Sequence, residues 1–136
     1  MIYYAVIDTN VVISAMLNPD SIPGLVLKYV LSGAIVPLLH DEIINEYEEV
    51  INRDKFGFDI KDINFIMSKL QEKGLFLDKT STKEKFIDQK DIVFYEIVLT
   101  GRKDTGAYLV TGNLKHFPNK AFVVTPKEMI DIINSN

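Results

Sequence analysis

Carboxylates stand at three places in the sequence from which they could meet in a folded domain. Asp8 directly follows an apolar run at 2–7, and Glu46 lies in a helical stretch after a second apolar run. Asp88 and Asp91 open a later helical stretch. The carboxyl ends of parallel strands, where helices begin, meet at one edge of a sheet. Carboxylates that cluster there repel one another unless a divalent cation that prefers oxygen ligands binds them, so the pattern predicts a divalent-cation site.

Each of these acids also has a purely structural interpretation. Asp8 is a favourable N-cap for a helix that begins just after it. Asp88 and Asp91 can converge on one side of a first helical turn, but they also suit a cap and a position near the positive end of the helix dipole. Glu46 and Glu48 both flank the apolar stripe of their helix, so periodicity does not choose between them. These alternatives stay open from the sequence.

Other polar groups add to the pattern or limit it. Thr111-Gly112-Asn113 follows a later apolar run and would bring a hydroxyl and an amide to the edge expected for Asp8, although Gly-Asn also suits a tight turn. His40 and His116 are too isolated to indicate a zinc site, which needs three or four ligands. No G-x-S-x-G, G-x-x-x-x-G-K-[ST] or G-x-G-x-x-G motif occurs. Serine hydrolases with that motif and phosphate-loop nucleotide binders are therefore excluded.

The composition limits the class of protein. The chain has 136 residues, of which 47% are hydrophobic and 25% are charged, as expected for one globular domain. It contains no cysteine, which rules out disulfides and thiolate metal sites. The first residues lack the basic flank of a secretory signal, and no apolar run approaches the roughly 20 residues of a membrane span. We expect a cytoplasmic protein that does not associate with a membrane.

The charges are distributed unevenly along the chain. Residues 1–78 contain six Lys or Arg and twelve Asp or Glu, whereas residues 79–127 contain nine and five. The formal net charge of -4 argues against strong non-specific binding of nucleic acid. An anionic ligand is expected on the basic part, although a solvated surface can show the same bias.

The order of apolar runs predicts an α/β fold in one domain. Short runs rich in β-branched residues alternate with stretches of helical periodicity, which is the pattern of a parallel sheet covered by helices. Strands are expected at 2–7, 34–39, 75–77, 108–111 and 122–125. Helices are expected to begin near residues 10, 23, 41, 59–62, 88 and 126, at capping residues or at prolines in a first turn.

Several short motifs, in order and with suitable spacing, resemble one protein family. They are Ile7-Asp8-Thr9-Asn10-Val11-Val12, Asn45-Glu46-Tyr47, Asp88-x-x-Asp91, Leu109-Val110-Thr111-Gly112-Asn113 and Lys115-His116-Phe117. Together they resemble the PIN domain family, and most closely the small bacterial VapC-like PIN proteins described as toxins of toxin-antitoxin systems. The resemblance covers essentially the whole chain, and its specificity comes from the combination of motifs.

The resemblance implies a fold, an activity and partners. The fold is a single PIN-like domain over residues 1–136, a three-layer α/β/α sandwich with a mainly parallel, roughly five-stranded sheet. The activity is that of a metal-dependent ribonuclease, which uses Mg²⁺ or Mn²⁺ to hydrolyse RNA phosphodiester bonds as the toxin of a toxin-antitoxin module. A cognate antitoxin and a second copy of the chain are the expected protein partners. Asp8, Glu46 and Asp91 match the catalytic and metal-binding acids, with Asp88 as a neighbouring metal-binding acid.

Small polar residues and cations complete the predicted site. Thr9, Asn10, Ser14 and Thr111 match positions where family members keep small polar side chains, and we expect them to hydrogen bond to the carboxylates or to water. Asn113 stands where many members have a fourth aspartate, which removes one ligand for a second metal ion; some toxin-like members share this asparagine. The groups expected to contact the RNA backbone are Lys90, Arg102, Lys103, Lys115 and His116.

Two other functions are consistent with parts of the pattern. One is a catalytically inactive PIN-like module that binds RNA or an antitoxin, for which Asn113 is the sequence evidence. The other is a phospho-acceptor domain, which also has an acid after its first strand. Such a domain would have a second acid beside Asp8, where this chain has Ile7 and Thr9, and it is therefore disfavoured.

Overall fold

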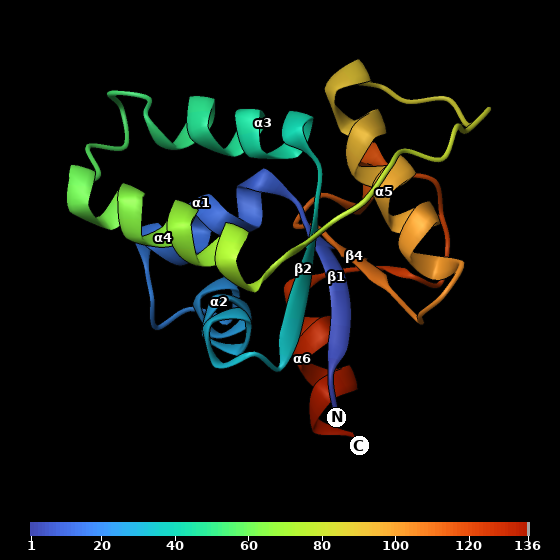
Figure 1. Ribbon diagram of the computed structural model, residues 1–136, viewed down its shortest axis with the longest axis horizontal. Coiled ribbons are helices and arrows are strands. Elements are labelled where there is room, and N and C mark those ends of the chain that lie inside the picture. Colours follow the sequence, from blue (N-terminus) through green and yellow to red (C-terminus); the bar gives the residue numbers. More distant parts are fainter. Residues whose placement is uncertain (136) are drawn as a thin grey trace.

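A five-stranded sheet forms the centre of the protein (Figure 1), whose computed structural model describes residues 1–135. The strands are β1 (Tyr3–Ile7), β2 (Ile35–Leu39), β3 (Leu75–Phe76), β4 (Tyr108–Val110) and β5 (Val123–Val124). Every neighbouring pair is parallel, in the order β3-β2-β1-β4-β5. The sequence predicts all five strands, with bounds that differ by no more than one residue at either end.

The strand order creates a switch point at the middle of the sheet. The chain builds outward from β1 to β2 and β3, and then crosses to the other side of β1 to add β4 and β5. β1 pairs with β4 so that Val6 is opposite Leu109. In open α/β sheets, ligands bind at the carboxyl edge next to such a reversal. Asp8 and Thr111 directly follow β1 and β4, so both lie at this edge.

The α-helices begin next to residues that favour a helix start, such as capping residues and prolines. They are α1 (Thr9–Leu17), α2 (Ile22–Ser32), α3 (Asp41–Ile51), α4 (Ile60–Lys73), α5 (Ile92–Arg102) and α6 (Pro126–Asn134). α6 begins with a reciprocal capping box between Thr125 and Glu128. Only the helix expected from residue 88 differs in type, because its first turn is the 3₁₀ helix η1 (Gln89–Asp91) and α5 starts after it. A second 3₁₀ helix, η2 (Leu114–His116), follows β4.

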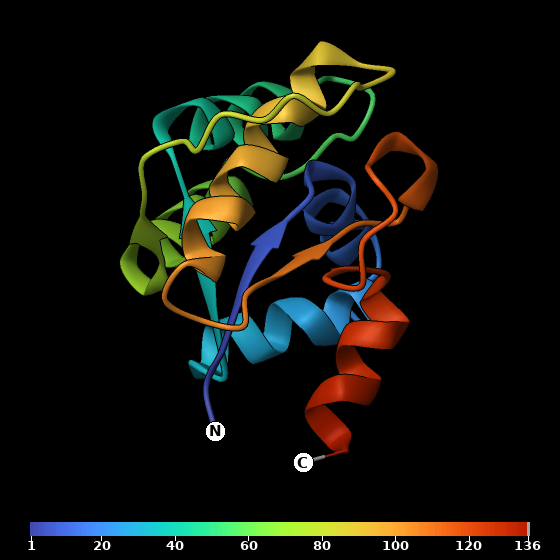
Figure 2. The ribbon, with the colours of Figure 1, turned by 90° about the vertical axis from the view of Figure 1, so that its right-hand side faces the viewer.

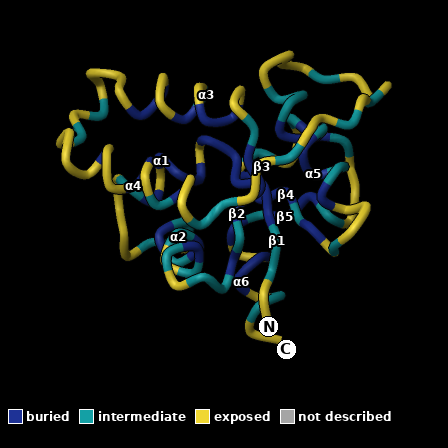
Figure 3. Tube along the Cα trace, in the orientation of Figure 1, coloured by how far each residue is buried: buried dark blue, intermediate teal, exposed yellow. Residues whose placement is uncertain are grey.

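The helices cover both faces of the sheet, which confirms the predicted α/β/α sandwich. α5 packs on one face against β1, β2 and β4, and α2 lies on the other face, where it contacts α1, α4 and α6 (Figures 1 and 2). α3 packs against α1, α4 and α5. Buried residues run along β1, β2, β4 and β5 and along the inward sides of the helices, whereas both residues of β3 are exposed (Figure 3). Within residues 1–135, none of the helices has the length and apolar character needed to cross a bilayer.

A buried tyrosine ties α3 to the sheet and to α5. Tyr47 has no exposed surface, and its hydroxyl donates a hydrogen bond to the backbone carbonyl of Ile7. Its ring lies against that of Phe94 in α5, with the centroids 6.3 Å apart. Burial raises the pKa of Tyr47, so the hydroxyl stays protonated and available as a donor. One side chain therefore fixes the spacing between the end of β1, α3 and α5.

Tyr47→Phe should lower the free energy of unfolding by about 1–3 kcal/mol, because the buried Ile7 carbonyl loses this donor. Urea denaturation followed by circular dichroism measures the change. Tyr29→Phe is the matched control, because the Tyr29 hydroxyl makes only an exposed, 3.4 Å contact with Asn134. Equal stabilities of the two variants would contradict a stabilising role for the Tyr47 hydroxyl.

Candidate active site

Asp8 stands at the N-cap position of α1, but its side chain makes no capping hydrogen bond. Its carboxylate instead accepts a hydrogen bond from the Thr111 hydroxyl, with 2.7 Å between Oδ2 and Oγ1. Its backbone N–H donates to the carbonyl of Val110 at 2.9 Å. The residue is only 6% exposed. The carboxylate is thus directed across the switch point toward β4, and the capping interpretation of its side chain is wrong.

Thr111 holds two parts of the site with one hydroxyl. It is fully buried, and while Oγ1 donates to Asp8 it also accepts the backbone N–H of Asn113 at 3.0 Å. The first bond fixes the carboxylate, and the second fixes the turn that leads into η2. The expected hydrogen bond between Thr111 and a carboxylate is therefore present.

Glu46 faces the site, and its neighbour Glu48 does not. The Thr9 hydroxyl donates to Glu46 Oε2 at 2.6 Å, and Thr9 is buried at the start of α1. Glu46 is half-buried, whereas Glu48 is exposed. Helical periodicity does not distinguish Glu46 from Glu48. In the structure Glu46 is the one that faces the site, because the Thr9 hydroxyl lies on its side of α3.

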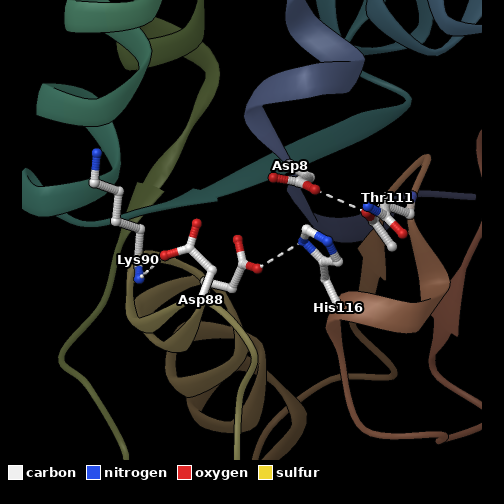
Figure 4. A network of polar contacts seen from close by, with 7 residues as sticks. Asp8, Asp88, Lys90, Thr111 and His116 are labelled. Carbon is white, nitrogen blue, oxygen red and sulfur yellow. Dashed lines mark hydrogen bonds and ion pairs between the residues drawn. The ribbon is translucent and has the colours of Figure 1, made fainter.

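The two aspartates of the later motif have different surroundings. Asp88 is exposed, and its Oδ1 accepts the backbone N–H of Lys90 at 2.9 Å, so this side chain caps η1. Asp91 makes no capping bond, and its Oδ2 lies 3.1 Å from Nδ1 of His116. Figure 4 shows Asp8 joined to Thr111 and an oxygen of Asp88 turned toward the backbone of Lys90, whose side chain extends away from the two aspartates. The side chain of Asp88 is thus a helix cap, as one interpretation of the sequence holds, and the side chain of Asp91 is not.

Burial and mutual repulsion make the two inner carboxylates hard to ionise. Burial is the main cause that raises the pKa of Asp8; the charge of Glu46 adds to it, while the Thr111 hydrogen bond acts in the opposite direction. Burial followed by the charge of Asp8 raises the pKa of Asp91 to about 6, against an opposing effect of His116. Acids with raised pKa values at a strand-end edge are typical of functional sites.

The chemistry of these donors fits a hard divalent cation. Asp8, Glu46 and Asp91 offer carboxylate oxygens, the ligands that Mg²⁺ and Mn²⁺ prefer, and a cation would offset their repulsion. In the part of the chain that the structure describes, no three His, Cys, Asp or Glu side chains are already arranged as one ligand set. The fit therefore rests on the type of donor and on the shared electrostatics of Asp8 with Glu46 and Asp91.

The remaining small polar residues of the prediction lie farther from these contacts. Asn10 and Ser14 are exposed on α1, and within residues 1–135 the structure gives neither side chain a hydrogen bond. Asn113 is half-buried at the start of η2, with its backbone N–H on Thr111. Of the five expected small polar residues, Thr9 and Thr111 are the two whose side chains bond to the acids.

The predicted RNA-binding cations fall into two groups. Lys90 and Lys115 are exposed on η1 and η2, next to Asp91 and His116. Arg102 and Lys103 lie at the other end of α5 from Asp91, about 16 Å away along an 11-residue helix. Arg102 donates to the carbonyl of Ala107 at 2.6 Å and its guanidinium lies 4.5 Å from the ring centroid of Phe122. The fold does not bring Arg102 and Lys103 to the acids.

A groove of about 440 Å³ lies beside Glu46, between α3 and the start of α5. Its charged lining consists of Glu42, Glu46, Glu49, Glu96, Lys79 and Lys90. Lys79 is already paired with Glu42 at 2.6 Å. Acids thus outnumber unpaired cations, so a phosphate backbone would need a bound cation to approach this side of the site.

Two features of the site have only a weak sequence signal. Tyr47 belongs to the apolar stripe of α3, and periodicity identifies it as a core residue without revealing that its hydroxyl reaches Ile7. His116 is separated from Asp91 by 25 positions, and nothing in the spacing pairs them. Both contacts depend on tertiary packing.

The raised pKa of Asp91 predicts how pH changes the stability of the metal-free protein. Between the ordinary value of 3.8 and about 6, the folded protein binds the Asp91 proton more tightly than the unfolded chain does. The contribution of this group to stability is therefore present below about pH 4 and is lost as the pH rises through about 6. With EDTA at pH 7.5, Asp91→Asn should be more stable than wild type by on the order of 1 kcal/mol, after allowance for solvent screening, and the difference should vanish near pH 4.

Urea denaturation at the two pH values measures this difference. Asp59→Asn is the matched control, because Asp59 caps α4 at an exposed position where asparagine caps equally well. A stability difference for Asp91→Asn that is the same at both pH values would show that the effect has another origin.

Comparison with known families agrees with this geometry. A family model described as a PIN domain matches residues 4–115, a span that contains Asp8, Glu46, Asp91 and Thr111. A search of curated proteins gives no match to the chain. PIN domains are generally nucleases, and such nucleases typically use divalent metals. The extent of the match shows that this chain belongs to the PIN domain family.

Proposed function

We propose that this protein is a metal-dependent ribonuclease that hydrolyses RNA phosphodiester bonds, with Asp8, Glu46 and Asp91 as the residues that hold Mg²⁺ or Mn²⁺. Family membership supports the class of nuclease. The observation that carries the proposal is the Asp8 carboxylate, which is buried at the switch point, leaves its helix uncapped and shares the site with other acids. A structural aspartate would be expected to cap α1 or to form an ion pair with a cation.

The chain itself would orient the cation-binding acids. Thr111 holds Asp8, Thr9 holds Glu46, and the hydroxyls leave one oxygen of each carboxylate free of these bonds. Hydrogen bonds of this kind fix the direction of ligating carboxylates and tune their affinity. When bound, a divalent cation supplies Lewis-acid chemistry: it offsets charge on the phosphate and lowers the pKa of water.

The exposed lysines next to the acids are the proposed contacts to the RNA backbone. Lys90 and Lys115 stand on the two 3₁₀ helices that carry Asp91 and His116. Phosphate contacts from such residues position a nucleic acid without reading its sequence. Arg102 is engaged with Ala107 and Phe122 at the far end of α5, so we do not include it in this role.

The resemblance of the motifs to small bacterial VapC-like PIN proteins supports a more specific role. We propose that the protein acts in the cytoplasm as the toxin of a toxin-antitoxin module, with a protein antitoxin as its partner. The alternative is a PIN domain that binds RNA or an antitoxin without cutting, and Asn113 in place of a fourth aspartate is the observation that favours it.

Asp8→Asn should reduce RNA cleavage by at least about a hundredfold while leaving the protein folded, because it removes a proposed metal ligand and replaces a carboxylate that is costly to bury. The measurement is cleavage of an end-labelled, mixed-sequence single-stranded RNA with Mg²⁺, with Mn²⁺ and with EDTA. Asp59→Asn, prepared identically, controls for contaminating nucleases and for the chemistry of the substitution.

Three results can be distinguished. Metal-dependent cleavage by wild type and Asp59→Asn that is lost in Asp8→Asn supports the nuclease and its site. Cleavage that persists in EDTA or in Asp8→Asn contradicts the proposed site. If no protein cleaves RNA under any condition, the inactive binding module becomes the better explanation.

A further inference from the structure

His116 stands opposite Asp91 although the two residues come from different elements. Its Nδ1 lies 3.1 Å from Asp91 Oδ2, within hydrogen-bond distance (Figure 4). The His116 side chain is 38% exposed and that of Asp91 is 15% exposed. The contact is therefore partly shielded from water, and a hydrogen bond there is stronger than one on an open surface.

The backbone around η2 holds the imidazole in place. Asn113 donates its N–H to the buried Thr111 hydroxyl at 3.0 Å, and His116 donates its own N–H to the Asn113 carbonyl at 3.1 Å. The next residue, Phe117, is buried and packs edge-on against Phe86, with the ring centroids 6.2 Å apart. His116 is thus fixed on both sides, by the turn after β4 and by an aromatic anchor.

The orientation of the Asp91 carboxylate depends on its contact with His116. Its carboxylate does not cap α5, and the one side-chain hydrogen bond that the structure gives it within residues 1–135 is to His116. Thr111 and Thr9 serve the corresponding purpose for Asp8 and Glu46. Each of the three acids therefore has a side-chain hydrogen-bond partner: Thr111 for Asp8, Thr9 for Glu46 and His116 for Asp91.

The direction of the hydrogen bond follows from the chemistry of the two groups. An ionised carboxylate has only acceptor oxygens, so the proton between them belongs to Nδ1 of the imidazole. A carboxylate that ligates a cation is ionised. His116 would then donate to Oδ2 of Asp91 and leave Oδ1 free for a ligand.

We propose that His116 is a positioning residue, whose Nδ1–H holds Asp91 in the orientation needed to bind a divalent cation. This inference rests on the proposed function, because it assigns Asp91 to a cation site. It differs from the role predicted from the sequence, in which His116 contacts RNA. A positioning residue changes the affinity for the metal when no RNA is present, whereas an RNA contact does not.

The test is isothermal titration of Mn²⁺ into RNA-free protein, for wild type and for three substitutions of His116. His116→Ala should weaken Mn²⁺ binding by about 10- to 100-fold, the usual loss when a partner of a metal ligand is removed. His116→Asn should bind within about threefold of wild type, because the asparagine Nδ2 takes the place of Nδ1 on Cγ. His116→Gln carries its amide one carbon farther out, so it should bind as weakly as the alanine variant.

The controls separate folding from positioning. Asn119→Ala removes an exposed side chain shortly after η2 and should bind Mn²⁺ as wild type does. Thermal unfolding of every variant with EDTA shows whether the substitution has damaged the fold rather than the site. The difference between the asparagine and glutamine variants is the readout that a merely structural role of His116 would not produce.

The outcomes distinguish this inference from the proposed function. If wild type binds Mn²⁺ and His116→Ala binds it equally well, positioning by His116 is wrong and the cation site stands. Equal weakening by alanine, asparagine and glutamine also overturns positioning through Nδ1, and would indicate that the imidazole itself is a ligand. If wild type binds no Mn²⁺ at any concentration tested, the proposed cation site fails, and the role of His116 fails with it.

Discussion

The burial of an ionisable carboxylate at the end of the central strand is the constraint on which the arrangement of this protein depends. Removing a carboxylate from water is costly unless polar partners replace the water. Apart from tyrosines, the buried polar side chains in the described part of the chain are Asp8, Thr9 and Thr111, and all three stand at this junction. These polar side chains are thus concentrated where β1 and β4 end, and the buried Tyr47 hydroxyl also reaches the end of β1.

The neighbouring elements are arranged around that carboxylate. β4 must pair with β1 in a fixed register to bring Thr111 to Asp8. α3 must lie close enough for Glu46 to reach Thr9, and the Tyr47 hydroxyl on the Ile7 carbonyl sets that distance. Burial raises the pKa of Asp8 and Asp91, and a carboxylate with a raised pKa lowers the stability of the metal-free protein near neutral pH. A site that destabilises its own fold in this way is characteristic of function rather than of packing.

The sequence predicts the secondary structure well because local signals agree with the tertiary fold. Each strand is an apolar run bounded by turn or capping residues, and Pro23 and Pro126 mark the first turns of their helices. The site is predicted less completely. Position after β1 identifies Asp8, but only the approach of Thr111 shows that its side chain is not a cap. Charge alone suggests Arg102 as an RNA contact, but it does not reveal that the direction of α5 places Arg102 at the opposite end of that helix from Asp91.

The wide separation of Asp8 and Thr111 along the chain has a consequence for biosynthesis. The hydrogen bond between them spans 103 positions, and Asp91 and His116 also come from the last part of the sequence. A nascent chain that has emerged only as far as α4 contains Asp8 and Glu46 but neither the strand nor the residues that complete their surroundings. The contacts around these acids therefore cannot form until β4 and η2 have left the ribosome. Any binding or chemistry that needs these contacts has to wait until residues as late as His116 have been synthesised.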